Sequence, residues 1–158
     1  GQNCFDFELD KGFLEQYEET EIQDAKLKAY VEAEKTSSHI DITVRITGVI
    51  DIACTRCLGV FSYPIDCENR LLVKFGQTDD ESDPDIIIIP KDKHELNLMQ
   101  YFYEYIFLAL PIKRVHPDDK NGESTCDKEM IKKLSEYIVN GEGLADPRWD
   151  KLRCLMKN

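Results

Sequence analysis

Residues 39–75 decide the fold and read HIDITVRITGVIDIACTRCLGVFSYPIDCENRLLVKF. Apolar and polar residues alternate on both sides of a cysteine pair, Cys54 and Cys57. The apolar positions are Ile40, Ile42, Val44, Ile46, Ile50 and Ile52, then Phe61, Tyr63, Ile65, Cys67, Leu71, Val73 and Phe75. This alternation is typical of strands that bury one face. Gly48 falls on the apolar face, where it would permit a bend or a close backbone contact. The stretch therefore predicts two long antiparallel strands joined by a short link.

The flanking segments extend this pattern into a sheet. The same alternation occupies residues 5–9 and 25–33, and KTSSH at 35–39 is typical of a turn. IIIIP at 86–90 predicts a further, short buried strand, and Pro64 places its own strand at an edge or a bulge. Short links between successive strands favour an antiparallel meander.

The second half of the chain is helical in pattern. Apolar residues at helical spacing predict a helix over residues 97–110, with Asn97 as its cap and Pro111 as its stop. A further helix begins near Asp127 and ends near Gly141. Its inward residues are expected to be Met130, Ile131, Leu134 and Ile138. A last helix begins at ADPRW, with Asp146 as its cap.

The expected fold is a single α+β domain over residues 1–158. An antiparallel sheet of about five strands, strongly twisted or partly closed into a barrel, packs on the central apolar helix 97–110, and two C-terminal helices cover the remainder. Between strand and helix regions, GQTDDESDPD at 76–85 is acidic and lacks apolar residues, which predicts a solvated, mobile loop.

Composition narrows the class of partner. The chain has a net charge of −11, so its average surface repels a phosphate backbone and suits a basic protein partner. No apolar run approaches the ~20 residues of a membrane span, and no signal peptide is visible. We therefore expect reduced thiols in the cytoplasm, and neither a membrane nor a DNA partner. The oligomeric state is left open.

The sharpest local signal is CTRCLG at 54–59. Two thiolates two residues apart can bind one zinc ion from a tight turn, but a structural site needs four protein ligands. His116 and Cys126, in the polar stretch after the predicted helix, are the candidates for the other two. Zinc is the only cofactor that the residues suggest. Two alternatives stay open: a redox pair, which a strand-to-strand link disfavours, and a plain hairpin turn with two packed thiols.

Catalytic signatures are absent from the sequence. It contains no P-loop, no GxGxxG, no GxSxG and no HExxH. His39 falls in a predicted turn and His94 in a polar link, which is typical of surface histidines. Arg56, Lys113 and Arg114 would form a small basic patch if the two loops converge, and this patch could contact RNA phosphates.

Several motifs follow one another in an order that resembles a known family. CTRCL at 54–58 precedes HELNLMQYFYEYIFLALPIKRVH at 94–116, then Cys126, then DPRWDKL at 146–152. This order is similar to the YceD-like family, domain of unknown function 177, also called large ribosomal RNA subunit accumulation proteins. The resemblance spans about Phe5 to Leu155. Some members carry a second cysteine pair after LALP. This chain has His116 and Cys126 there, and histidine can replace cysteine as a zinc ligand.

The resemblance implies a non-catalytic factor that supports large-subunit ribosomal RNA accumulation and large-subunit assembly. Such a factor would bind precursor RNA, a ribosomal protein or another assembly factor. Two rival hypotheses remain: a metal- or thiol-dependent enzyme that uses Cys54 and Cys57, and a generic acidic interaction module.

Overall fold

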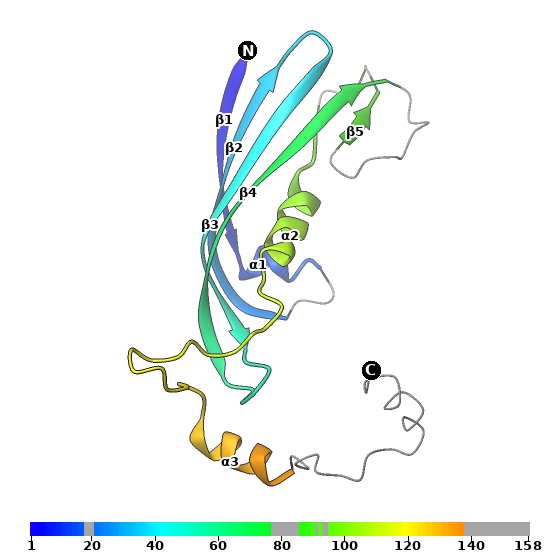
Figure 1. Cartoon of the computed structure of the whole chain (residues 1–158). Helices are drawn as coiled ribbons and strands as arrows, with labels where there is room; N and C mark the ends of the chain where they lie inside the picture. The colour runs from blue at the N-terminus through cyan, green and yellow to red at the C-terminus, as the bar shows by residue number, and fades with distance from the viewer. Residues whose placement is uncertain (18–20, 77–85, 91, 93–94, 138–158) are drawn as a thin grey trace, which may run out of the picture. The chain divides into compact units, whose positions relative to one another are not determined.

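The computed structural model describes residues 1–17, 21–76, 86–90, 92 and 95–137. The chain falls into two compact units, Gly1–Cys126 and Asp127–Asn158. The prediction of one domain over residues 1–158 stays a prediction. The first unit contains a five-stranded sheet in the order β1-β2-β3-β4-β5, together with two helices (Figure 1).

Four long strands form the meander that the alternation predicts. They are β1 (Gln2–Asp10), β2 (Ile22–Lys35), β3 (His39–Ala53) and β4 (Val60–Phe75). Each neighbouring pair is antiparallel. The predicted apolar phase is confirmed in β3, where Val44, Ile46 and Ile52 are fully buried. Because the side-chain period of a strand is two, this burial fixes the register of the whole sheet.

Gly48 permits the close contact that its place on the apolar face predicts. Its φ is +145°, and it lies opposite Leu27 of β2. A Cβ at this position would overlap the carbonyl oxygen of Lys26 and lie 2.9 Å from the Cα of Leu27. Only glycine fits here, so β2 and β3 can approach closely at this position.

The predictions of a purely antiparallel and partly closed sheet are wrong. The last strand, β5 (Ile86–Ile89), pairs in parallel with Leu72–Phe75 of β4, and the described strands form an open, mixed sheet. Only Ile89 of this strand is buried, because β5 lies at the edge. Periodicity reports which face of a strand is buried but carries no information about pairing direction. Pro64 lies in the part of β4 that β5 does not reach, which agrees with an edge position.

Helix α2 (Met99–Leu108) is shorter than the predicted 97–110. The N-cap position is Leu98, which makes no side-chain capping bond, so the predicted Asn97 cap is wrong by one residue. The Asn97 side chain lies just before it and accepts a hydrogen bond from the Met99 N–H at 2.9 Å. Phe102, Tyr105 and Ile106 belong to the same buried cluster as the strands, and the Phe102 ring lies 5.4 Å from that of Phe7. That α2 is the central cover of the sheet stays a prediction.

Two further helices complete the described chain. The short helix α1 (Lys11–Leu14) is capped by Asp10, whose carboxylate accepts from the Phe13 N–H at 3.0 Å. In the second unit, α3 (Lys128–Tyr137) buries none of its residues, so the predicted inward positions of Met130, Ile131 and Leu134 are not borne out by burial. Among the described residues, no helix is both long and apolar enough to cross a membrane.

Three predictions lie outside the described residues: the acidic loop beyond Gly76, the end of the helix near Gly141 with Ile138, and the last helix from Asp146. The surface assignment of His94 also lies outside them.

Candidate metal centre

The link between β3 and β4 folds into a tight knuckle at its two cysteines. The Leu58 N–H donates to the carbonyl oxygen of Cys54 at 2.9 Å, and the Cys54 N–H donates to the carbonyl of Gly59 at 2.8 Å. The Arg56 N–H points at the Cys54 sulfur, at 3.4 Å. The turn thus places Cys54 and Cys57 on one side, with backbone donors directed at sulfur.

Leu58 holds the knuckle in a strained conformation. Its φ is +61°, and it is the only described non-glycine residue with a positive φ. A left-handed conformation costs an L-residue roughly 1–2 kcal/mol. The Leu58 side chain is 70% exposed, so burial does not offset that cost.

The other two candidate ligands are brought together by a small hairpin. Asp118 and Ser124 form an antiparallel bridge, and the carboxylate of Asp119 accepts from the N–H groups of Asn121 and Glu123, at 2.8 Å each. Gly122, with φ of +81°, supplies the left-handed residue of the turn. The hairpin explains how a ten-residue separation can deliver two ligands to one point.

The knuckle and this second segment are joined directly. The N–H and hydroxyl of Thr55 both donate to the carbonyl oxygen of Arg114, at 2.7 and 2.9 Å. Gly59 leaves space for the His116 ring, because a Cβ there would lie 3.4 Å from its Cε1. The Phe61 ring also lies beside the histidine ring, with centroids 4.9 Å apart.

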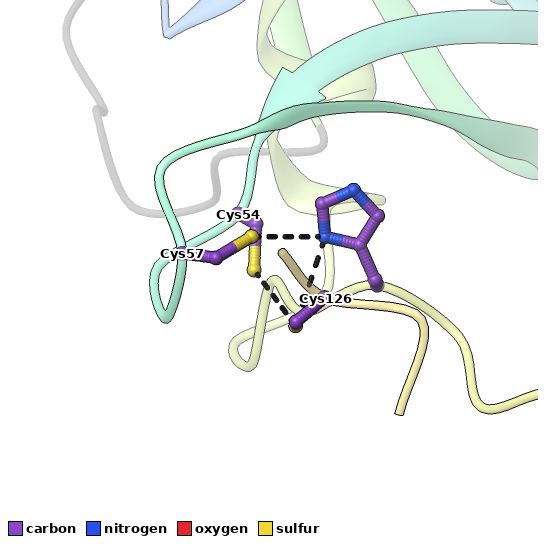
Figure 2. A group of neighbouring side chains, drawn as sticks. Cys54, Cys57 and Cys126 are labelled. Carbon is purple, nitrogen blue, oxygen red and sulfur yellow. Dashed lines mark hydrogen bonds between the residues drawn. The ribbon is translucent and has the colours of Figure 1, made fainter. Parts of the chain in front are cut away.

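The four candidate donor atoms converge on one point. The sulfurs of Cys54, Cys57 and Cys126 and one ring nitrogen of His116 all lie within 4.8 Å of one another. Figure 2 shows the three cysteines gathered beside one nitrogen of the histidine ring. Cys54 Sγ lies 3.8 Å from Cys126 Sγ, and His116 Nδ1 lies 3.4 Å from Cys57 Sγ and 3.8 Å from Cys126 Sγ.

These three distances are close to the edges of a tetrahedron around zinc, and the four donor atoms span up to 4.8 Å. Bonds of ~2.3 Å to sulfur and ~2.0–2.1 Å to nitrogen give edges of about 3.8 Å between sulfurs and about 3.5 Å between sulfur and nitrogen. Three sulfurs and one imidazole nitrogen are also the donor types of structural zinc sites. The group could therefore hold a metal ion, and its donor types are compatible with zinc.

The electrostatics of the cluster favour a bound cation. Burial raises the pKa of the Cys54 thiol, but N–H groups of the knuckle and of His116 donate toward the sulfur and outweigh burial, lowering the pKa to about 5. The Ser124 hydroxyl lowers the pKa of Cys126, but burial and the neighbouring sulfurs outweigh it and raise that pKa. The pKa of Cys54 is therefore lowered beside a Cys126 thiol whose pKa is raised. A bound metal cation would allow both sulfurs to ionise.

The three basic residues predicted to contact RNA differ in how exposed they are. Arg56 and Lys113 are exposed, one on each of the two joined segments. The Arg114 guanidinium instead forms an ion pair with Glu21, and its Nε is buried without a described partner. An RNA contact by these three residues stays a prediction, and Arg114 is the least available of them. His39 lies at the surface, as expected, and contacts Asp41 at 3.0 Å.

Sequence reasoning missed the supporting residues Thr55 and Phe61. Gly59 was part of the CTRCLG signal, because a glycine shortly after the second cysteine lets the backbone fold into a knuckle, and the structure places it there. The role of Thr55 had no signal in the sequence, since the group that its side chain bonds is a backbone carbonyl 59 residues away.

Fold and cluster together define a small α+β protein whose sheet carries a Cys₃His group suited to a structural metal. The family model described as "Large ribosomal RNA subunit accumulation protein YceD" matches residues 42–156, and the chain belongs to this YceD family. No curated protein and no solved structure matches the chain. The matched range contains all four cluster residues, whereas β1 and β2 lie outside it.

Proposed function

We propose that this protein is a non-catalytic factor that supports accumulation of large-subunit ribosomal RNA and assembly of the large ribosomal subunit. The supporting observation is the YceD family match over residues 42–156. The protein would act in the cytoplasm by occupying a surface on precursor RNA, a ribosomal protein or another assembly factor until assembly advances.

The proposal includes a structural zinc ion held by Cys54, Cys57, His116 and Cys126. Catalytic zinc sites keep one position open for water or substrate, whereas structural sites use four protein ligands. Four donors converge here, so a bound ion would have no open position. Zinc would tie the knuckle to the hairpin and hold Arg56 and Lys113 on adjoining segments, where they could contact RNA phosphates.

A thiol enzyme is the second candidate, and the lowered pKa of Cys54 is the observation that favours it. Its weakness is access, because the Cys54 side chain is fully buried. A generic acidic interaction module is the third candidate and rests on net charge alone.

Depletion and complementation test the proposal. Cells depleted of the protein should show a lowered ratio of large- to small-subunit ribosomal RNA, and the wild-type gene should restore it. An unchanged ratio, without precursor accumulation, would refute the proposed function. If the basic residues contact RNA, the double variant Arg56→Glu, Lys113→Glu should restore the ratio less well. The matched control is Arg70→Glu, Lys74→Glu, which changes two exposed cations of β4 by the same charge.

A further inference from the structure

The outer edge of β1 offers a free set of backbone hydrogen-bonding groups. Strand β1 is the first in the sheet order and pairs only with β2 within the described chain. The pairing runs from Gln2 to Asp10 without a register shift. Natural edge strands are commonly blocked by proline, lysine or a bulge. The sequence QNCFDFELD contains neither residue, and its ladder has no bulge.

The backbone hydrogen bonds at the start of β1 identify which residues face outward. Gly1 and Lys35 exchange both of their backbone hydrogen bonds, at 2.9 and 3.0 Å. In an antiparallel ladder such hydrogen-bonded pairs alternate with pairs whose groups point away. Odd-numbered residues of β1 therefore bond to β2, and even-numbered residues direct N–H and C=O to the open edge. The outward residues are Gln2, Cys4, Asp6 and Glu8.

The side chains around this edge specify the chemistry of an added strand. Asp6 and Glu8 lie on the solvent face, and on β2 Asp6 has Tyr30 opposite it whereas Glu8 has Lys28. Asp6 is therefore the carboxylate without a cation opposite it. The other face presents Phe5, which is 51% exposed, followed by the half-buried Phe7. A strand added alongside would place alternate residues beside the carboxylates and the intervening ones beside Phe5.

We propose that the outer edge of β1 binds an extended segment of another protein in which basic and apolar residues alternate. Its cations would face Asp6 and Glu8, its apolar residues would cover Phe5, and its backbone would continue the sheet. A second copy of β1 is disfavoured, because antiparallel self-pairing brings acidic residues of the two strands together. RNA is disfavoured because the same carboxylates repel phosphate. This inference deepens the proposed function. That the edge binds an extended basic segment follows from the strand itself, whereas naming the partner a ribosomal or assembly protein rests on the proposed function.

The test is fluorescence anisotropy of the full chain with a short labelled peptide of alternating lysine and valine. We expect saturable binding that weakens with salt, because the paired charges are exposed. A second peptide has the same sequence with alternate backbone nitrogens methylated. It keeps the charge but loses the N–H donors along one of its two edges. Its binding should be about fivefold weaker or more. Equal binding of both peptides would overturn the proposal by reducing the interaction to charge alone, and absence of binding would overturn it as well.

Protein variants then locate the site. Asp6→Pro removes one outward N–H without touching the ladder to β2, and it should weaken peptide binding by at least about fivefold beyond Asp6→Ala. Asp6→Lys should weaken binding, whereas Glu68→Lys, the same charge change at an exposed position of β4, should not. Thermal melts establish that each variant is folded.

Equal binding by Asp6→Pro and Asp6→Ala would contradict the edge assignment. A dimer in light scattering that Asp6→Pro dissociates would show that the occupant is a second copy and overturn the proposal.

The two proposals fail separately. If the chain restores ribosomal RNA but no peptide binds, the edge inference is wrong and the proposed function stands. If the peptide binds but depletion leaves ribosomal RNA unchanged, the edge binds a partner outside ribosome assembly.

Discussion

Cys57 and His116 are 59 residues apart in the chain, yet the Cys57 sulfur lies 3.4 Å from Nδ1 of His116. Two local turns bring these residues together: the knuckle that follows β3 and the hairpin that follows α2. Thr55 joins them through two hydrogen bonds to one carbonyl. The cluster therefore couples the tip of the sheet to the segment beyond the helix, and loss of one ligand should affect both.

The purified protein should contain one zinc ion, and Cys126→Ser should lose it. Since the fourth ligand closes the site, we expect a fall in Tm of about 5 °C or more, which corresponds to ~2 kcal/mol in a chain of this size. Metal analysis and thermal melts, with and without a chelator, measure both effects. Cys4→Ser is the matched control, because Cys4 is exposed on β1 and outside the cluster. Full metal content in Cys126→Ser would contradict the ligand assignment.

Alkylation should separate the metal ligands from the free thiols. In the native, zinc-loaded protein, iodoacetamide should modify the exposed Cys4 first and leave Cys54, Cys57 and Cys126 unmodified. Adding a chelator should make all three reactive, because a coordinated sulfur is not a free nucleophile. Peptide mapping by mass spectrometry follows each site. Rapid modification of Cys54 before chelation would favour the thiol-enzyme hypothesis.

Leu58→Gly should stabilise the protein by about 1 kcal/mol. It removes a left-handed penalty of roughly 1–2 kcal/mol, partly offset by the greater freedom of glycine in the unfolded chain. The exposed side chain contributes little packing that could be lost. Leu58→Ala is the control, since it truncates the side chain but retains the Cβ that causes the strain. Equal free energies of unfolding for the two variants, from chemical denaturation, would show that the backbone at Leu58 is not strained.

Gly48→Ala should destabilise the protein by about 2–3 kcal/mol. The added Cβ would overlap the Lys26 carbonyl oxygen, and the φ of +145° is unsuited to alanine. Gly76→Ala provides the comparison, because a Cβ there would lie 3.6 Å from the nearest side-chain carbon, an ordinary contact. Denaturation curves measure both changes. Similar stabilities of the two variants would indicate that β2 and β3 do not approach as closely as described.

The sequence predicts the strands well where burial follows a strict alternation. Ile46 and Val44 are buried as their phase requires, and Gly48 is on the face that the pattern indicates. The direction of strand pairing is harder to predict from the sequence. The parallel pairing of Ile86 with Leu72 depends on the path of the chain between them and not on the local pattern.

The cluster was predictable in its residue types and not in its geometry. Cysteine and histidine are the donors that zinc selects, so Cys54, Cys57, His116 and Cys126 could be nominated together. The convergence of the two loops could not be derived from spacing, although the Asn121-Gly122 pair was a visible turn signal within the hairpin. The pairing of Arg114 with Glu21 likewise depends on a contact between distant segments.

The proposed role in large-subunit assembly can be tested by sedimentation of a tagged copy of the protein from growing cells, with ribosomal RNA probed in every fraction of the gradient. The proposed function predicts that the protein migrates with particles lighter than the mature large subunit, and that these fractions are enriched in precursor large-subunit RNA. A protein found only at the top of the gradient, in low salt and after mild crosslinking, would contradict it.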